Sequence, residues 1–430
     1  MFETVKSNHL SLEAKTEGLS YISIRDTNRK SGRITAAIQL PLKEETAAVN
    51  ALVPYILKRA CRAYPSFTAL NQKLALLYGA VIRANVRKLG DNQLLTLTIS
   101  AIDDRFALGG ESVTRECAKL LGSMLFEPVL EDGCFREKDV EIEKRQLKEY
   151  IESEINDKRK YAKNRALEII CKDEPYGINP LGSVEAVEAL DAKTVTEAWQ
   201  NILKRAQIVL IITGGADPEP IAAEFNLNFK GIKRDYEKPN VSYAKGAAEE
   251  VKREVERIDV QQAKLVAGFR SGIAPESAEA AAARLMGVLL GGTPHSRLFL
   301  NVREKLSLCY YCSSNYEKLK GILTVESGLE EQNMEKAWKE VMKQLEEIQE
   351  GSFEESEMES AKLSFTNALL SARDSIGSLE SWYLSQIAEP TLRSPEEVAA
   401  ESNSVSREDI IKAANKMVLD TVYLLTGMEA

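Results

Sequence analysis

The stretch "GCFREKDVEIEK" (residues 133–144) returns later in the chain as "GSFEESEMESAK" (residues 351–362). Both copies read Gly-x-Phe-x-Glu and end in Glu-x-x-Lys. The segments around them also repeat. Each copy follows a strand-like alternation of apolar and polar residues and then a helical period. Each is followed by a second helical period and then by an apolar run that ends in Thr-Gly. The matching pairs are residues 93–102 and 321–329, 111–126 and 334–348, 194–203 and 408–417, and 206–215 and 421–427. The chain is therefore predicted to contain one unit used twice.

The repeated unit has helices set apart from runs of alternating strands, a pattern typical of α+β domains. We expect two homologous α+β halves, each a mostly antiparallel sheet with helices packed on one face. The stretch "KGIKRDYEKPNVSYAKGAAEE" is polar, charged and interrupted by Pro and Gly, so it is the predicted joint. The boundary falls near residues 235–250, which gives an N-terminal domain over 1–240 and a C-terminal domain over 241–430.

Composition excludes several classes of protein. The 430 residues carry a formal net charge of −9 and no basic stripe with interleaved aromatics, which disfavours nucleic-acid binding. No apolar run approaches the roughly 20 residues that span a bilayer, and the first residues do not resemble an export signal. Six scattered cysteines in such a chain indicate free thiols in a reducing compartment. We expect a cytoplasmic protein that binds neither nucleic acid nor membrane.

Histidine is the most restrictive count. The chain has only two, His9 and His295. They lack any metal-ligand spacing, so multi-histidine metal sites and most histidine-based acid–base chemistry are nearly excluded. His295 is expected to make a structural hydrogen bond near its turn.

The stretch "SRLFLNVREKLSLCY" (residues 296–310) reads as an amphipathic helix that breaks at Ser307 and runs into a strand. With the duplicated α+β half, it resembles the pitrilysin/insulinase family of zinc peptidases, to which the mitochondrial processing peptidase belongs. The likeness covers nearly the whole chain. It implies that Arg303 and Tyr310 bind substrate and stabilise the reacting peptide bond. A guanidinium and a phenol suit this role because both donate hydrogen bonds to an oxygen that gains charge. Without the family, a helix-capping arginine and a packed strand tyrosine are the simpler reading.

Active family members carry an inverted zinc motif, His-x-x-Glu-His, on the helix after the first long strand. Here its register falls on Tyr55, Lys58 and Arg59, and the third ligand position falls on Tyr150. Two cations in place of two ligands and a general base would repel Zn²⁺. We therefore expect no metal and no cofactor in this chain, and these positions are read as a plain helix surface with a solvated basic face.

Whole-chain detail resembles a metal-less bacterial branch of the family, the YmfF-like branch, whose members are encoded beside a YmfH-like relative that keeps the zinc motif. The resemblance implies a non-catalytic subunit that lends Arg303 and Tyr310 to this zinc-bearing homologous partner, with a peptide or unfolded protein as substrate. It also implies a link to the 5-aminopentanol modification of elongation factor P. No catalysis is expected from the chain alone. The alternative is a homodimeric peptide-binding or scaffolding protein with no peptidase role.

Three further features complete the expectations. In active relatives the first strand of the hairpin at residues 78–103 pairs with substrate by strand addition. The corresponding residues here are Ile82, Arg83, Ala84, Asn85 and Val86. Cys309 and Cys312 lie in a strand, where positions i and i+3 face opposite sides, so they are read as packing thiols. The glycines at 291 and 292 are read as a helix C-cap.

Overall fold

The computed structural model describes residues 10–16, 18–229, 231–389 and 391–428, and His9 therefore lies outside the described residues. Contacts divide the chain into two units. The N-terminal unit takes its described residues from 1–152, 178–240 and 373–392. The C-terminal unit takes them from 153–177, 241–372 and 393–430. The chain passes between the two units five times, and one of these passages lies between Asn240 and Val241, within residues 235–250.

The N-terminal unit is built on a six-stranded sheet in the order β1-β2-β8-β3-β5-β4. Its strands are β1 (Leu10–Thr16), β2 (Leu19–Arg25), β3 (Ser31–Pro41), β4 (Val81–Leu89), β5 (Asn92–Ile102) and β8 (Gln207–Gly214). All neighbours are antiparallel except β2 and β8. Alternate residues of β3, such as Ile34, Ala36 and Ile38, enter one large apolar core.

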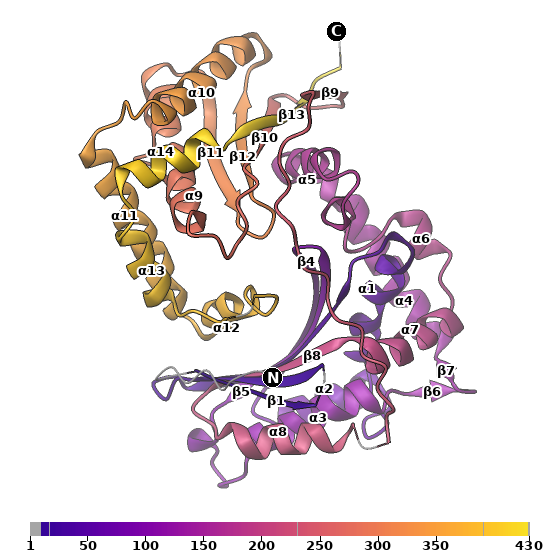
Figure 1. Cartoon of the computed structure of the whole chain (residues 1–430). Coiled ribbons are helices and arrows are strands. Elements are labelled where there is room, and N and C mark those ends of the chain that lie inside the picture. Colours follow the sequence, from indigo (N-terminus) through magenta and orange to yellow (C-terminus); the bar gives the residue numbers. More distant parts are fainter. Residues whose placement is uncertain (1–9, 17, 230, 390, 429–430) are drawn as a thin grey trace. The chain divides into compact units, whose positions relative to one another are not determined.

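Helices of the same unit cover the apolar face of this sheet. They are α1 (Glu44–Leu57), α2 (Phe67–Leu76), α3 (Val113–Phe126), α4 (Glu137–Glu152), α6 (Val184–Glu188), α7 (Ala192–Arg205) and α8 (Pro218–Leu227). Figure 1 shows α3 and α8 along one side of the strands. The start of α7 follows local capping rules: the Asp191 side chain accepts from the backbone N–H of Thr194, and the Thr194 hydroxyl accepts from the backbone N–H of Asp191.

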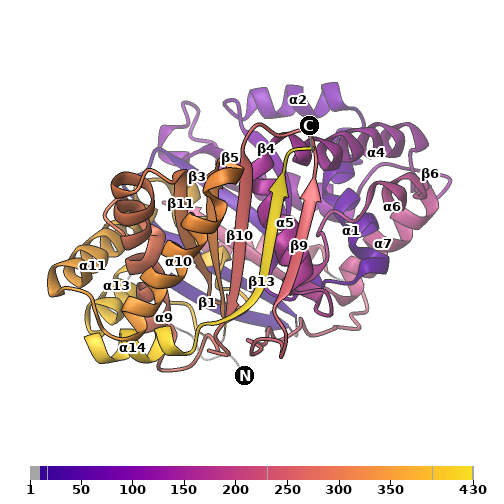
Figure 2. The ribbon, with the colours of Figure 1, turned by 90° about the horizontal axis from the view of Figure 1, so that it is seen from above.

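The C-terminal unit repeats this plan with five strands in the order β11-β12-β10-β13-β9. The strands are β9 (Lys252–Arg257), β10 (Ala263–Arg270), β11 (Cys309–Glu317), β12 (Ile322–Leu329) and β13 (Val418–Thr426). Only β13 and β9 run parallel, just as β2 and β8 do in the first sheet. Figure 2 shows β10, β13 and β9 side by side. The matching strand orders confirm the duplication and the α+β class.

Helices lie mainly on one face of the second sheet as well. They are α9 (Ala280–Gly287), α10 (Met334–Gln349), α11 (Glu355–Leu370), α13 (Pro395–Asn403) and α14 (Arg407–Asn415), with two short helical segments, η4 (Val288–Gly292) and η5 (Phe299–Lys305). Figure 1 shows them on the side of the sheet away from α5. The core between sheet and helices contains Leu265, Ala267 and Phe269 of β10.

The opposite face of each sheet carries one helix from the other half of the sequence. In the C-terminal unit, α5 (Lys158–Ile170) packs through Ala162 and Ala166 against Val266 and Tyr423. In the N-terminal unit, α12 (Ile376–Leu384) lies against β3, where Glu380 accepts a hydrogen bond from Thr35 at 2.7 Å. The two units thus exchange one helix each. The sequence-based division into two halves did not include this exchange.

The remaining short elements are β6 (Leu130–Glu131), β7 (Cys134–Phe135), η1 (Asp104–Phe106), η2 (Ser153–Asn156), η3 (Pro175–Gly177), η6 (Glu331–Asn333) and η7 (Ser371–Arg373). Among the described residues, no helix combines the length and the apolar character that a membrane crossing requires.

Candidate functional site

The segment that carries Arg303 and Tyr310 folds as a helical turn, a break and an edge strand. The turn η5 ends at Lys305, Ser307 adopts a left-handed φ of 50°, and the backbone N–H of Leu308 donates to the carbonyl of Val302 at 3.1 Å. The strand β11 then begins at Cys309. The predicted helix, break and strand are therefore confirmed.

A buried arginine fixes this segment to the helices beneath it. Arg297 donates to Gln344 of α10 at 2.9 Å and to both carboxylate oxygens of Glu357 of α11 at 3.0 Å. It also pairs with Glu347. Its side chain is 7% exposed. Arg297 belongs to the motif of residues 296–310. Its role in fixing the segment depends on partners on α10 and α11, which the motif alone does not indicate.

Arg303 and Tyr310 themselves present half-exposed side chains. The Arg303 guanidinium lies 4.6 Å from the ring centre of Phe299, and its Nε lies 3.6 Å from Glu304. The Tyr310 hydroxyl donates to Glu330 at 3.2 Å, and this hydrogen bond raises the pKa of Tyr310. Each side chain is thus held by its own acidic neighbour, and both can reach a partner molecule from the same unit. Their role in substrate binding stays a prediction.

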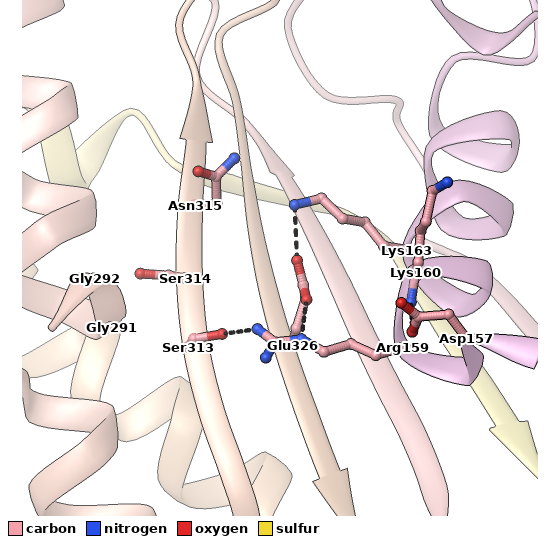
Figure 3. A pocket seen from close by; sticks show the side chains of 10 residues that line it. All are labelled: Asp157, Arg159, Lys160, Lys163, Gly291, Gly292, Ser313, Ser314, Asn315 and Glu326. Carbon is pink, nitrogen blue, oxygen red and sulfur yellow. Dashed lines mark hydrogen bonds and ion pairs between the residues drawn. The ribbon is translucent and has the colours of Figure 1, made fainter. Parts of the chain in front are cut away.

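A cavity of about 440 Å³ opens beside the same strand. Figure 3 shows its lining side chains, with cations reaching in from α5 and a pair of glycines on the other side of β11. The residues are Asp157, Arg159, Lys160, Lys163, Gly291, Gly292, Ser313, Ser314, Asn315 and Glu326. Three cations and two carboxylates give the lining a net charge of about +1. A wide, polar cavity at the edge of a sheet suits an extended peptide better than an apolar cofactor.

The polar floor of this cavity is an ion-pair network. Glu326 of β12 has a side chain 7% exposed and lies 3.0 Å from Arg159 Nε and 2.9 Å from Lys163 Nζ. Arg159 also donates to the Ser313 hydroxyl at 2.9 Å and stacks on the Tyr311 ring at 4.2 Å. The network ties α5 to the strands it covers.

The two glycines beside the cavity do not form the predicted C-cap. A glycine C-cap takes a left-handed φ, whereas Gly291 has φ −155°. The reason for glycine here is space: a Cβ on Gly291 would lie 2.5 Å from the backbone nitrogen of Ser314. The helical segment η4 therefore approaches β11 more closely than any other residue type would allow.

Two cysteines of the same strand correct another expectation. The pairing of β11 with β12 shifts between Cys309 and Tyr311, which leaves Tyr310 as an extra residue. Cys309 is opposite Leu329 and Cys312 is opposite Ser327, so the bulge turns both thiols to one face. The prediction that they face opposite sides was wrong because it assumed an unbroken strand.

The positions that correspond to the zinc motif lie at the end of α1. Lys58 caps the helix, its Nζ 5.0 Å from the Tyr55 ring centre, and burial raises the pKa of Tyr55 to about 12. Arg59 is not the solvated cation that the sequence indicated. It lies 3.0 Å from Asp139 and 2.8 Å from Glu143, both on α4, and the Glu143 side chain is only 3% exposed.

The predicted third ligand position is exposed. Tyr150 of α4 has 56% of its surface in solvent, and Glu149 beside it is exposed as well. The residues at the motif offer an ammonium, a guanidinium and phenols, which do not fit a zinc ion as ligands. Within the described residues, no group of three or more His, Cys, Asp or Glu side chains is placed to hold a metal. His295 is exposed, and its backbone N–H donates to Thr293 at 3.2 Å.

The predicted substrate strand is β4, which forms one edge of the N-terminal sheet. Among the described strands it pairs only with β5. Ile82 and Ala84 are half-buried against the core, and Arg83 and Asn85 are exposed. An edge strand presents the backbone groups that strand addition requires, and peptide binding at β4 stays a prediction.

Known proteins are similar to this chain in sequence and fold. A family described as "Peptidase M16 inactive domain" matches residues 189–365. A probable inactive metalloprotease of Bacillus subtilis, YmfF, is 29% identical over 418 residues, covering 97% of this chain and 98% of its own. These matches support placing the chain among the inactive members of the peptidase M16 family. This is the pitrilysin/insulinase family indicated by the motif of residues 296–310, and the relatives support a non-catalytic member of it.

Two further proteins match over most of the chain. An uncharacterized zinc protease of Rickettsia felis is 22% identical over 71% of this chain and 73% of its own length. The crystal structure of a conserved protein from Enterococcus faecalis superimposes with a TM-score of 0.87 at 26% identity, covering 96% of this chain and 97% of that one. The two-unit architecture is therefore shared along almost the full length of a solved relative.

Proposed function

We propose that this chain is the non-catalytic subunit of a two-chain zinc peptidase. It would bind an extended peptide or unfolded protein and lend Arg303 and Tyr310 to a homologous, zinc-bearing, YmfH-like partner. The observation that carries the proposal is a contrast. At the metal positions Arg59 is locked between two carboxylates, whereas Arg303 and Tyr310 keep half-exposed donor groups.

The chemistry divides naturally between two chains. The partner supplies the metal and the general base. From this chain, the Arg303 guanidinium donates to a peptide carbonyl, and the Tyr310 hydroxyl donates to the oxygen that gains charge as the bond is attacked. The Arg303 guanidinium is already oriented by Phe299 and Glu304, whereas the Tyr310 hydroxyl exchanges its hydrogen bond to Glu330 for one to substrate.

The decisive experiment mixes the purified chain with the zinc-bearing homologue and measures cleavage of an unfolded protein. Arg303→Ala should lower kcat/KM of the mixture by a factor that corresponds to about 2–4 kcal/mol of activation free energy, the loss expected for one transition-state donor. Lys305→Ala removes an exposed cation two residues away and is the matched control, with activity near that of the unchanged mixture. Equal activity for both variants would remove Arg303 from the proposal.

The metal-free part of the proposal is tested on this chain alone. Because Tyr55 and Arg59 stand at the two histidine positions and Lys58 at the glutamate position, the purified chain should retain no stoichiometric zinc after dialysis. Elemental analysis that finds one equivalent of zinc would contradict this and would favour a residual peptidase with an unusual metal site.

The second candidate is a homodimer that binds peptides or acts as a scaffold without any peptidase role. The edge strand β4 and the cavity beside β11 favour it, since both can hold an extended chain without chemistry. A stable homodimer that neither binds the zinc-bearing homologue nor stimulates it would support this candidate.

The family resemblance adds a cytoplasmic location and a link to the 5-aminopentanol modification of elongation factor P. A strain that lacks this chain should then accumulate elongation factor P without the modification, as measured by intact mass. Reintroducing the chain with Arg303→Ala separates a peptidase role, which the variant cannot restore, from a scaffolding role, which it can.

A further inference from the structure

The β-bulge in β11 brings two thiols together in a way that the proposed function does not use. Tyr310 is the extra residue of the bulge, and the cysteines on either side of it are opposite residues two apart on β12. Side chains two apart in a strand share a face. Cys312, 3% exposed, belongs to the core between the sheet and its helices, and Cys309 is half-buried against that same core.

The surroundings of the two thiols differ, which gives them different chemistry. A hydrogen bond from the Cys312 thiol, followed by one from Ser327 and the charge of Arg303, lowers the pKa of Cys309 to about 7, although burial opposes the shift. The same hydrogen bond and deeper burial raise the pKa of Cys312. At neutral pH, Cys309 therefore has a large thiolate fraction, and Cys312 stays protonated.

The other described cysteines offer no comparable pair. Burial raises the pKa of Cys61, and burial raises that of Cys117 to about 12. Cys171 is buried, and Cys134 is half-buried on the short strand β7. A half-exposed attacking thiol beside a buried resolving thiol occurs only at Cys309 and Cys312 among these six, all of which lie in the described part of the chain.

We propose that Cys309 and Cys312 form a redox-active dithiol that a hydroperoxide converts to an intrachain disulfide across the Tyr310 bulge. The Cys309 thiolate attacks one peroxide oxygen, which breaks the O–O bond and gives a sulfenic acid and hydroxide. The Cys312 sulfur then displaces the sulfenic oxygen as water, and the proton of Cys312 leaves with it. Hydroxide recovers the proton first lost by Cys309, so two thiols and hydrogen peroxide give one disulfide and two waters.

Oxidation would act directly on Tyr310, one of the two residues between the cysteines. A disulfide holds its two Cα atoms about 4.4–6.8 Å apart, so the bond fixes the bulge and the backbone of Tyr310 with it. This backbone carries the Tyr310 side chain, whose hydroxyl donates to Glu330. The disulfide itself does not depend on the proposed function, but a change in substrate contact at Tyr310 does.

The test uses the full-length reduced protein and one equivalent of hydrogen peroxide. Trypsin releases both cysteines in one peptide, residues 306–318, because Lys305 and Lys318 flank them. That peptide should lose two hydrogen atoms and regain them with dithiothreitol. In Cys312→Ser, Cys309 should stop at the sulfenic acid and be trapped by dimedone. Cys134→Ser is the matched control and should form the disulfide at the rate of the unchanged protein.

A measurement on the unchanged protein keeps the test independent of how the variants fold. Alkylation of Cys309 by iodoacetamide should follow a pH profile with its midpoint near 7, compared with about 8.5 for an unstructured cysteine peptide. Two free thiols in peptide 306–318 after peroxide treatment would overturn the proposal. Oxidation of Cys134 at an equal rate would overturn it as well, because the reaction would then not be selective for this pair.

Discussion

Glu174 is the residue whose loss should most clearly weaken the C-terminal unit. It follows α5, the helix that the first half of the sequence contributes to this unit, and its side chain is 5% exposed. Its carboxylate lies 2.7 Å from Lys320 Nζ and 2.5 Å from Arg270 Nη2. Arg270 also lies 3.3 Å from Asp420. Two buried cations thus face two carboxylates, with the exposed Lys245 3.8 Å from Glu174, and Glu174→Gln leaves a positive charge uncompensated in the interior.

The magnitude follows from the burial of the cations that remain. Side chains of Lys320 and Arg270 are only 1% and 4% exposed, so water cannot replace the lost carboxylate. Breaking one partner of such a buried pair costs about 3–5 kcal/mol. Glu279→Gln is the matched control, because its partner Lys416 is 45% exposed and that pair is worth less than about 1 kcal/mol.

Urea unfolding followed by circular dichroism measures the loss, and hydrogen exchange of residues 158–177 locates it. Burial raises the pKa of Glu174, but Lys320 and Arg270 lower it further, so it lies below its usual 4.5. The stabilisation is therefore complete above pH 4.5 and disappears as pH falls through the lowered pKa. The difference between wild type and Glu174→Gln should shrink in that acidic range. A loss under about 1 kcal/mol at pH 7, or a difference that grows in acid, would show that Glu174 does not balance the buried cations.

Two further substitutions test Arg59 and Gly291, whose surroundings in the structure differ from those expected from the sequence. Arg59→Met leaves the buried carboxylate of Glu143 unpaired and should lower the free energy of unfolding of the N-terminal unit by about 2–4 kcal/mol in urea. Arg62→Met, at a side chain 77% exposed, should change it by less than about 1 kcal/mol, and equal losses would contradict this. Gly291→Ala places a methyl group against the backbone of Ser314 and should cost about 1–3 kcal/mol. Faster amide exchange over residues 309–317 measures that strain. Unchanged exchange would show that η4 shifts to accommodate the methyl group without disturbing β11.

The duplication was predictable because it rests on local periodicity. Alternating strands and helical periods depend on residues close in sequence, and their order in "GCFREKDVEIEK" and its copy is visible without contacts. The break at Ser307 was predictable for the same reason. The exchange of α5 and α12 was not, because each packs on strands far away in sequence and its own residues do not indicate which sheet it will cover.

At the candidate site the errors share one cause, which is dependence on distant partners. Arg59 seemed a surface cation because Asp139 and Glu143 come 80 and 84 residues later. Cys309 and Cys312 seemed to diverge because the bulge exists only in the register with β12. The identity of Arg303 and Tyr310 came from the family motif, and their exposure could be known only after η5 and β11 were placed.

Native mass spectrometry of the chain, purified at its natural level from its own host, identifies the partner with which it works. We expect a one-to-one complex with a homologue that carries His-x-x-Glu-His and one zinc ion. Recovery of only a monomer or a homodimer would contradict the subunit role, and Arg303 and Tyr310 would then be structural residues.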